Sequence, residues 1–146
     1  MEPKLPDKGR FSIISRLRST THALRGLSIF LKTTHNAWVH FFFAILAIYL
    51  GFLLHISNVE WVLLVLTIGL VILFEMINTA IEIDIDLTSP TYHPYARDTK
   101  DVAAGAVSVA VIISGIVGAI IFLPKLLKFI LVGKIMKKNA MKPFLI

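Results

Sequence analysis

The chain has 146 residues, of which 56% are hydrophobic and 16% are charged. Soluble domains are about 45–50% apolar, so this composition excludes an ordinary water-soluble protein. The low charge content also excludes a disordered chain or a nucleic-acid-binding tail, and the lack of cysteine excludes a disulfide scaffold and a thiolate metal site. A net charge of +6 in so apolar a chain indicates an anionic membrane surface or substrate rather than DNA. The length fits one small integral membrane protein.

The first 36 residues are polar and basic, and they contain a helical pattern. Between Arg10 and Lys32 apolar residues recur at intervals of three, four and seven, with Arg and Lys beside them: Phe11, Ile14, Leu17, Leu24, Leu27 and Leu31. This spacing places them on one helix face. Two interpretations are open, a solvated helix packed on its own protein and an amphipathic helix on the membrane surface. We favour the surface helix.

Three apolar stretches follow, at about residues 37–56, 60–83 and 102–123. Each is long enough to cross a hydrocarbon core of about 30 Å as a helix. His40 interrupts the first stretch, and the third carries no charge and stops at Pro124. The sequence therefore predicts an all-α membrane protein with an N-terminal amphipathic surface helix and three transmembrane helices.

These stretches divide the chain into a basic N-terminal segment at 1–36, a three-span domain at 37–123 and a Lys-rich tail at 124–146. Nine Lys or Arg lie in the N-terminal segment and the loop before the third span, against six Lys in the tail, which weakly favours a cytoplasmic N-terminus. The alternative for the tail is an amphipathic segment along the membrane. Small residues at four-residue spacing in the third span favour a tight bundle or an oligomer: Ala106, Ala110, Ser114 and Gly118.

The second span carries a cluster of polar residues. Glu75, Asn78, Glu82 and Asp86 are spaced by three, four and four, so they share one helix face, while Asp84 points away. A single Glu could pair with a basic group on a neighbouring helix. Three carboxylates in register repel one another unless a cation or proton holds them, and Mg²⁺ is the cation that suits carboxylates and phosphates. The deeper, desolvated Glu75 is suited to take a proton from an alcohol.

The loop after this span contains cations near the next helix. Arg97 and Lys100 precede the third span, and a Lys near a helix N-terminus can contact a phosphate. The alternative is an ordinary snorkelling Lys. Residues 98–101 also resemble a helix cap, with Asp98 or Thr99 as the cap and Asp101 in the first turn, so Asp101 has either a capping or a functional role.

Together these residues resemble a known family. Residues 75–82 read Glu-Met-Ile-Asn-Thr-Ala-Ile-Glu, and Asp86, Tyr92-His93-Pro94, Lys100-Asp101 and the Ala-Ala-Gly-Ala-Val run at 103–107 follow in order. This set is similar to the signature of the prokaryotic diacylglycerol kinase and undecaprenol kinase family, over about residues 10–124.

The resemblance implies an ATP-dependent lipid kinase that works with Mg²⁺ as a homotrimer in the bacterial inner (plasma) membrane. It implies phosphorylation of a lipid hydroxyl at the cytoplasmic face, with undecaprenol favoured over diacylglycerol. Glu75 would be the general base and Glu82 a Mg²⁺ ligand. The nucleotide site would contain His22, Asn78, Asp86, His93, Lys100 and Asp101.

The chain departs from the family pattern at three positions. Thr34 stands where the family has a second metal-binding Glu, Trp38 where a basic residue is common, and Thr91 where a loop Glu is expected. A hydroxyl binds Mg²⁺ only weakly, so one alternative is a catalytically impaired member that acts as a membrane binding subunit. A further alternative, an ion or proton pathway, is disfavoured because the third span offers only Ser108 and Ser114 as polar residues.

Overall fold

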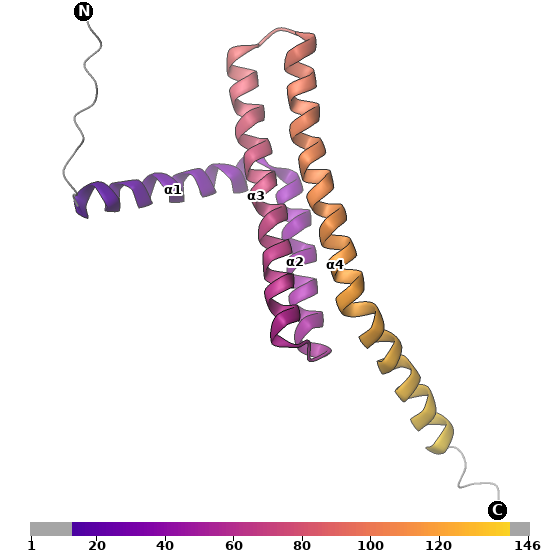
Figure 1. Ribbon diagram of the computed structural model, residues 1–146. Coiled ribbons are helices and arrows are strands. Elements are labelled where there is room, and N and C mark those ends of the chain that lie inside the picture. Colours follow the sequence, from indigo (N-terminus) through magenta and orange to yellow (C-terminus); the bar gives the residue numbers. More distant parts are fainter. Residues whose placement is uncertain (1–12, 141–146) are drawn as a thin grey trace, which may run out of the picture.

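The computed structural model describes residues 13–140, with side chains described from 18 to 137. The remaining parts of the N-terminal segment and of the tail, Phe11 among them, lie outside the described residues. The described chain forms four helices and no strand: α1 (Ile13–Thr33), α2 (His35–Leu53), α3 (Asn58–Thr88) and α4 (Pro94–Ala140). Helices α2, α3 and α4 form a bundle, and α1 extends sideways away from it (Figure 1).

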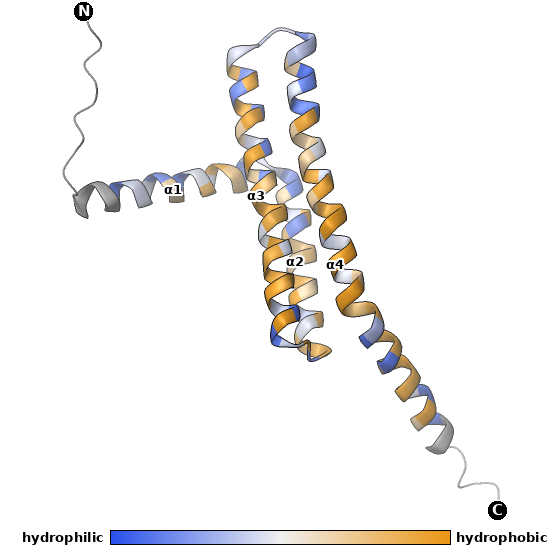
Figure 2. Cartoon of the chain, in the orientation of Figure 1, coloured by the Kyte–Doolittle hydropathy of each residue, from blue (hydrophilic) through white to orange (hydrophobic). Residues whose placement is uncertain are grey.

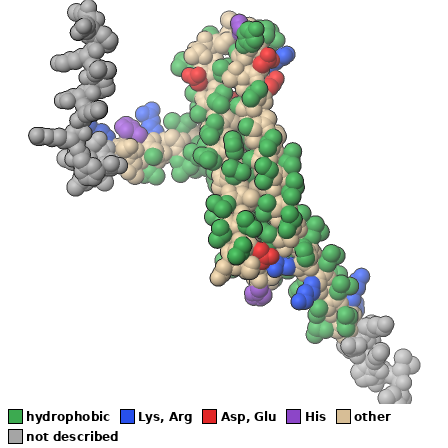
Figure 3. Space-filling view, viewed as in Figure 1, with side chains coloured by type: hydrophobic (Ala, Val, Ile, Leu, Met, Phe, Trp, Pro, Cys, Tyr) green, Lys and Arg blue, Asp and Glu red, His purple; other side chains and the backbone are tan. Residues whose placement is uncertain are grey.

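The three bundle helices are each long and apolar enough to cross a membrane. Apolar residues cover their middle parts, and polar residues gather towards the α3–α4 turn (Figure 2). Large apolar side chains such as Phe42, Tyr49 and Phe52 of α2 are exposed. In a hydrocarbon environment such side chains need no protein partner, so the exposed apolar surface is that of a membrane protein (Figure 3). The predicted all-α membrane fold is confirmed.

Helix α1 leaves the bundle at its C-terminal end. Of its described side chains only Phe30 is buried, and Leu24, Leu27 and Ile29 are exposed. The helix does not pack along its own protein (Figure 1). This arrangement favours the membrane-surface interpretation over a solvated helix packed on the bundle.

Helices α3 and α4 form the tightest contact of the bundle. Their buried side chains include Leu64 and Val71 of α3 and Val107, Ala110 and Ile121 of α4. The Ser114 hydroxyl of α4 donates to the Thr67 carbonyl of α3 at 3.0 Å. At Ala110 and Ser114 the predicted stripe of small residues therefore lies in the contact between α3 and α4 of the same chain.

The α2–α3 turn is fixed by close packing and by a helix cap. A Cβ on Gly51 would lie 2.8 Å from Cη2 of Trp61, so α2 approaches α3 there more closely than a side chain permits. Ser57 and Glu60 form a capping box at the start of α3. Glu60 also pairs with Lys125 of α4 at 3.1 Å, which ties the third bundle helix to this end.

Two helix boundaries differ from the sequence-based expectations. Helix α4 does not end at Pro124 but continues to Ala140. A proline removes one intrahelical hydrogen bond, but the helix here is supported by the buried Ile121 and by the Lys125 ion pair on either side. Helix α4 also begins at Pro94, a favoured first helical residue, so residues 98–101 are inside the helix and are not its cap.

Candidate active site

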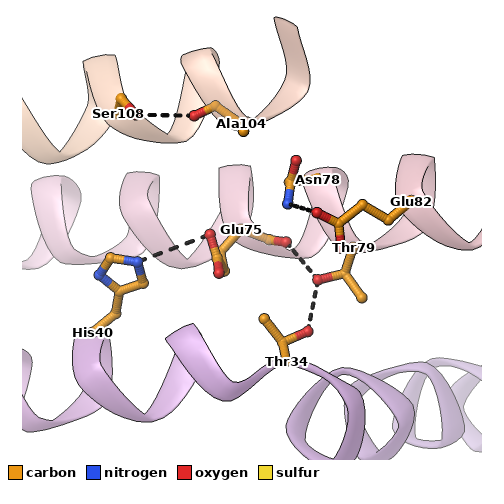
Figure 4. Close-up of polar contacts among 8 residues, drawn as sticks. All are labelled: Thr34, His40, Glu75, Asn78, Thr79, Glu82, Ala104 and Ser108. Carbon is orange, nitrogen blue, oxygen red and sulfur yellow. Dashed lines mark hydrogen bonds and ion pairs between the residues drawn. The ribbon is translucent and has the colours of Figure 1, made fainter. Parts of the chain in front are cut away.

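The predicted polar face of α3 is partly buried in the bundle. Glu75, Asn78 and Thr79 are the buried polar or charged side chains of the described chain, and Glu75 is only 3% exposed. Asn78 Nδ2 donates to Glu82 Oε1 at 2.9 Å (Figure 4). Glu82 is half-buried, while Asp86, one turn further on, is exposed. The face thus runs from a desolvated carboxylate to a solvated one, as its sequence spacing predicts.

Thr34 joins this face from the start of α2. It has an extended backbone conformation between α1 and α2, and its side chain makes no capping bond. Its hydroxyl lies 2.7 Å from the Thr79 hydroxyl, which donates to the Glu75 carbonyl at 2.9 Å. Since a hydroxyl has one hydrogen, Thr34 must be the donor to Thr79, and the lone pairs of Thr34 remain available as acceptors.

His40 is a member of the site that sequence reasoning missed. Its Nε2 lies 3.9 Å from Oε2 of Glu75, and both side chains point towards each other between α2 and α3 (Figure 4). The signal was present in the sequence, because an ionisable residue inside a span is a candidate functional residue. In the sequence, however, His40 stands out only as an interruption of the apolar stretch.

A second polar group lies where α3 and α4 meet the loop. Lys100 Nζ contacts Asp86 Oδ1, which holds this cation beside the end of α3. Arg97 pairs with Asp98 at 3.2 Å and with Asp101 at 3.9 Å, and these three side chains are well exposed. The structure therefore brings Lys100 to the carboxylate face and leaves Asp101 in a surface ion pair.

Two predicted nucleotide-contacting residues stay apart from this cluster. His22 on α1 and His93 before α4 are exposed. The ring of His93 lies 5.7 Å from that of Tyr95. Within residues 18–137, neither histidine makes a polar contact with the α3 carboxylates.

Comparison with known proteins agrees with this geometry. A model of the family described as "Prokaryotic diacylglycerol kinase" matches residues 21–122, a range that contains every candidate site residue named above. The chain belongs to this family. It is therefore a lipid kinase, a phosphotransferase that uses an alcohol as acceptor.

Individual relatives carry names of the same class. The chain is 43% identical to the undecaprenol kinase of Bacillus subtilis over 75% of this chain and 89% of the relative. It is 40% identical to a diacylglycerol kinase of Synechocystis over 76% of this chain and 64% of the relative. It is 31% identical to a diacylglycerol kinase of Haemophilus influenzae over 73% of this chain and 91% of the relative.

The polar face of this lipid kinase partly fits a divalent cation. No three of its described His, Asp and Glu side chains converge as a metal site would require. However, Asn78 Oδ1 is buried without a hydrogen-bond partner in the described chain, next to the Glu82 carboxylate that Nδ2 contacts. An amide oxygen beside a carboxylate is a donor set for Mg²⁺, which commonly binds through one or two protein carboxylates and completes its shell with phosphates and water.

Proposed function

We propose that this lipid kinase transfers the γ-phosphoryl group of ATP to undecaprenol. The main support is the buried Glu75 at one end of the Asn78–Glu82 face, because a lipid hydroxyl can reach it from the bilayer while ATP approaches the exposed end from water. The choice of undecaprenol rests on the undecaprenol kinase relative, which is 43% identical and covered over 89% of its length. The alternative acceptor is diacylglycerol, which the names of other relatives support.

In the proposed reaction the lipid oxygen attacks the γ-phosphorus. The bond between the γ-phosphorus and the oxygen that bridges it to the β-phosphate breaks. The hydroxyl proton moves to the Glu75 carboxylate, and ADP leaves. Lys100, held by Asp86, would bind phosphate oxygens as a charge-assisted donor. His22, His93 and Asp101 remain proposed nucleotide contacts.

The residues proposed to hold Mg²⁺ are Glu82 and Asn78, with Thr34 as a weak third ligand. Bound Mg²⁺ would neutralise the phosphate charge of ATP. Because Thr34 carries a neutral hydroxyl, the proposed Mg²⁺ site has less negative charge than it would have with a carboxylate at this position. We propose further that the enzyme is a homotrimer in the bacterial inner membrane with its site on the cytoplasmic side, as the family resemblance implies.

The test is phosphate transfer from labelled ATP, measured side by side on undecaprenol and diacylglycerol with purified protein in detergent–lipid micelles. We expect label in undecaprenyl phosphate, with kcat/KM for undecaprenol above that for diacylglycerol. A preference for diacylglycerol would overturn the acceptor assignment. Label in neither lipid would overturn the assignment of this chain as an active kinase.

An impaired enzyme that serves as a membrane binding subunit is the second candidate, because Thr34 and Thr91 replace the expected carboxylates. Thr34→Glu with Thr91→Glu should raise turnover sharply if metal binding limits it. Thr34→Gln with Thr91→Gln is the matched control, since it adds the same length without charge. Equal turnover in both pairs would contradict the metal-binding explanation.

A further inference from the structure

The candidate base lies in a part of the bundle where a charge needs a partner. Glu75 is only 3% exposed, on a helix that is apolar enough to cross a membrane. An ionised group at such a position is stable only beside an opposite charge or a hydrogen-bond donor. Without a partner the group takes its neutral form, and a neutral carboxylic acid cannot accept a proton from an alcohol. The proposed role of Glu75 therefore depends on its neighbours.

His40 is the one side chain within residues 18–137 that makes a polar contact with the Glu75 carboxylate. Its Nε2 lies 3.9 Å from Oε2, and the two side chains point towards each other across the α2–α3 contact (Figure 4). The hydroxyl of Thr79 donates to the backbone carbonyl of Glu75 and not to its carboxylate. Since 3.9 Å is longer than a hydrogen bond, His40 acts on Glu75 through its charge.

The face of α2 that carries His40 is buried in the bundle. Ala37 and Ala44, three residues before and four residues after His40, are both buried. Residues at this spacing share one side of a helix. The His40 ring therefore points into the bundle rather than into the lipid, which is the placement expected of a functional ionisable residue in a span.

Along α3 itself no cation reaches Glu75. Glu82, two turns further on, is an acid and repels a charge on Glu75. Lys100 contacts Asp86, which is three turns from Glu75 along the helix. The cation proposed for the phosphates is therefore at the far end of the polar face and does not balance the buried carboxylate.

The other helices supply no further cation to Glu75. Helix α4 has no ionisable residue from 102 to 124, and His35 on α2 is exposed. The ionisable side chains that the structure describes on α1 are exposed as well: Arg18, His22, Arg25 and Lys32. In the described part of the chain, His40 is thus the positive group available to the base.

From this geometry we propose that His40 is a positioning residue of the kinase reaction. As an imidazolium it is the counter-ion that keeps the Glu75 carboxylate ionised, and the ionised carboxylate then accepts the proton of the lipid hydroxyl. The proposal rests on Glu75 as the base of the proposed function, but it does not depend on which lipid alcohol is the acceptor. Histidine suits this task, because it gains and loses its charge near neutral pH and need not stay charged when Glu75 is neutral.

Substitutions at His40 separate its charge from its shape. His40→Gln removes the cation and keeps a polar side chain, whereas His40→Lys keeps a cation. General-base catalysis contributes about 100- to 10,000-fold, so kcat of His40→Gln should fall about tenfold or more, with the KM for ATP unchanged. His40→Lys should lose less. His55→Gln is the matched control and should leave kcat unchanged, because His55 is exposed on the α2–α3 turn, away from the polar face.

A double-mutant cycle tests whether His40 acts through Glu75. If it does, His40→Gln has no further effect on kcat in a Glu75→Gln background, because the base that it serves is absent. A merely structural role would lower kcat by the same factor in both backgrounds. That additivity would overturn the proposal, and so would an unchanged kcat in His40→Gln or equal losses in His40→Gln and His40→Lys.

The charge of Glu75 can also be measured without turnover. Infrared spectroscopy distinguishes a carboxylate from a protonated carboxyl group, and the band of Glu75 is the one that Glu75→Gln removes. We expect an ionised Glu75 in the wild type at neutral pH and a protonated Glu75 in His40→Gln. A protonated Glu75 in the wild type would overturn the proposal, even if the His40 variants fail to fold.

The two measurements separate this proposal from the proposed function. The expected infrared result in a wild type without kinase activity would retain the His40–Glu75 pair and remove the proposed function. An active kinase that depends on Glu75 but not on His40 would retain the proposed function and remove the role of His40.

Discussion

Glu75→Gln is the substitution that most directly separates chemistry from structure at this site. It keeps the size of the side chain and removes the proposed base. General-base catalysis contributes about 100- to 10,000-fold, so kcat should fall by that factor, which equals about 3–5 kcal/mol in activation free energy. ATP binding should be unchanged, since Lys100 and Glu82 are intact.

The structure also sets the expected effect of Glu75→Gln on stability. Breaking a well-formed buried ion pair costs about 3–5 kcal/mol. The His40–Glu75 separation of 3.9 Å is too long for a hydrogen bond, and a neutral amide costs less to bury than a carboxylate. We therefore expect no drop in the thermal unfolding midpoint, measured in detergent micelles.

Glu60→Gln provides the control for this experiment on the same helix. Glu60 is at the opposite end of α3, where it pairs with Lys125, and Gln can still complete the capping box. Its activity should equal that of wild type while its unfolding midpoint falls slightly. A loss of less than about tenfold in kcat for Glu75→Gln, or a loss of activity and stability together, would exclude Glu75 as the general base.

Two further substitutions test the packing and the nucleotide site. Gly51→Ala should destabilise the bundle by about 1–3 kcal/mol, because the new Cβ would lie 2.8 Å from Trp61. Gly69→Ala should not destabilise it, because a Cβ at Gly69 meets open space. Equal unfolding midpoints of the two variants would contradict the close packing of α2 on α3 at Gly51. Lys100→Met should raise the KM for ATP about tenfold or more through the loss of a charge-assisted hydrogen bond, whereas Lys128→Met on the exposed part of α4 should leave it unchanged. An unaltered KM in the Lys100 variant would place that residue outside the nucleotide site.

Much of this fold follows from the sequence because a bilayer restricts what an apolar chain can do. The hydrocarbon requires every backbone group to bond internally, so the apolar stretches must be helices, and spacing alone then places Glu75, Asn78 and Glu82 on one face. Contacts between helices are harder to predict from the sequence. The Thr34–Thr79 hydroxyl bond joins residues 45 positions apart, and no periodicity indicates which turn of α2 meets which turn of α3.

The helix ends show the same division between local and tertiary effects. Proline predicts a stop at residue 124 because it removes one hydrogen bond. The structure instead continues the helix, with the Glu60–Lys125 pair just beyond the proline. His40 is a different case, since its position in a span was visible, but its partner became apparent only when α2 was placed against α3.

The uninterrupted course of α4 has a consequence for how this protein orients in a membrane. A flexible Lys-rich tail would lie on the headgroups and would attract anionic lipids with all of its charge. Helix α4 instead carries Lys134 and Lys137 on a rigid rod, about 13 and 18 Å beyond Lys125 along its axis. These distances exceed the Debye length of about 8 Å at physiological salt. Salt ions therefore largely screen the interaction of Lys134 and Lys137 with charges at the level of Lys125, so these two lysines act on an anionic surface there far less than a flexible tail with the same charge would.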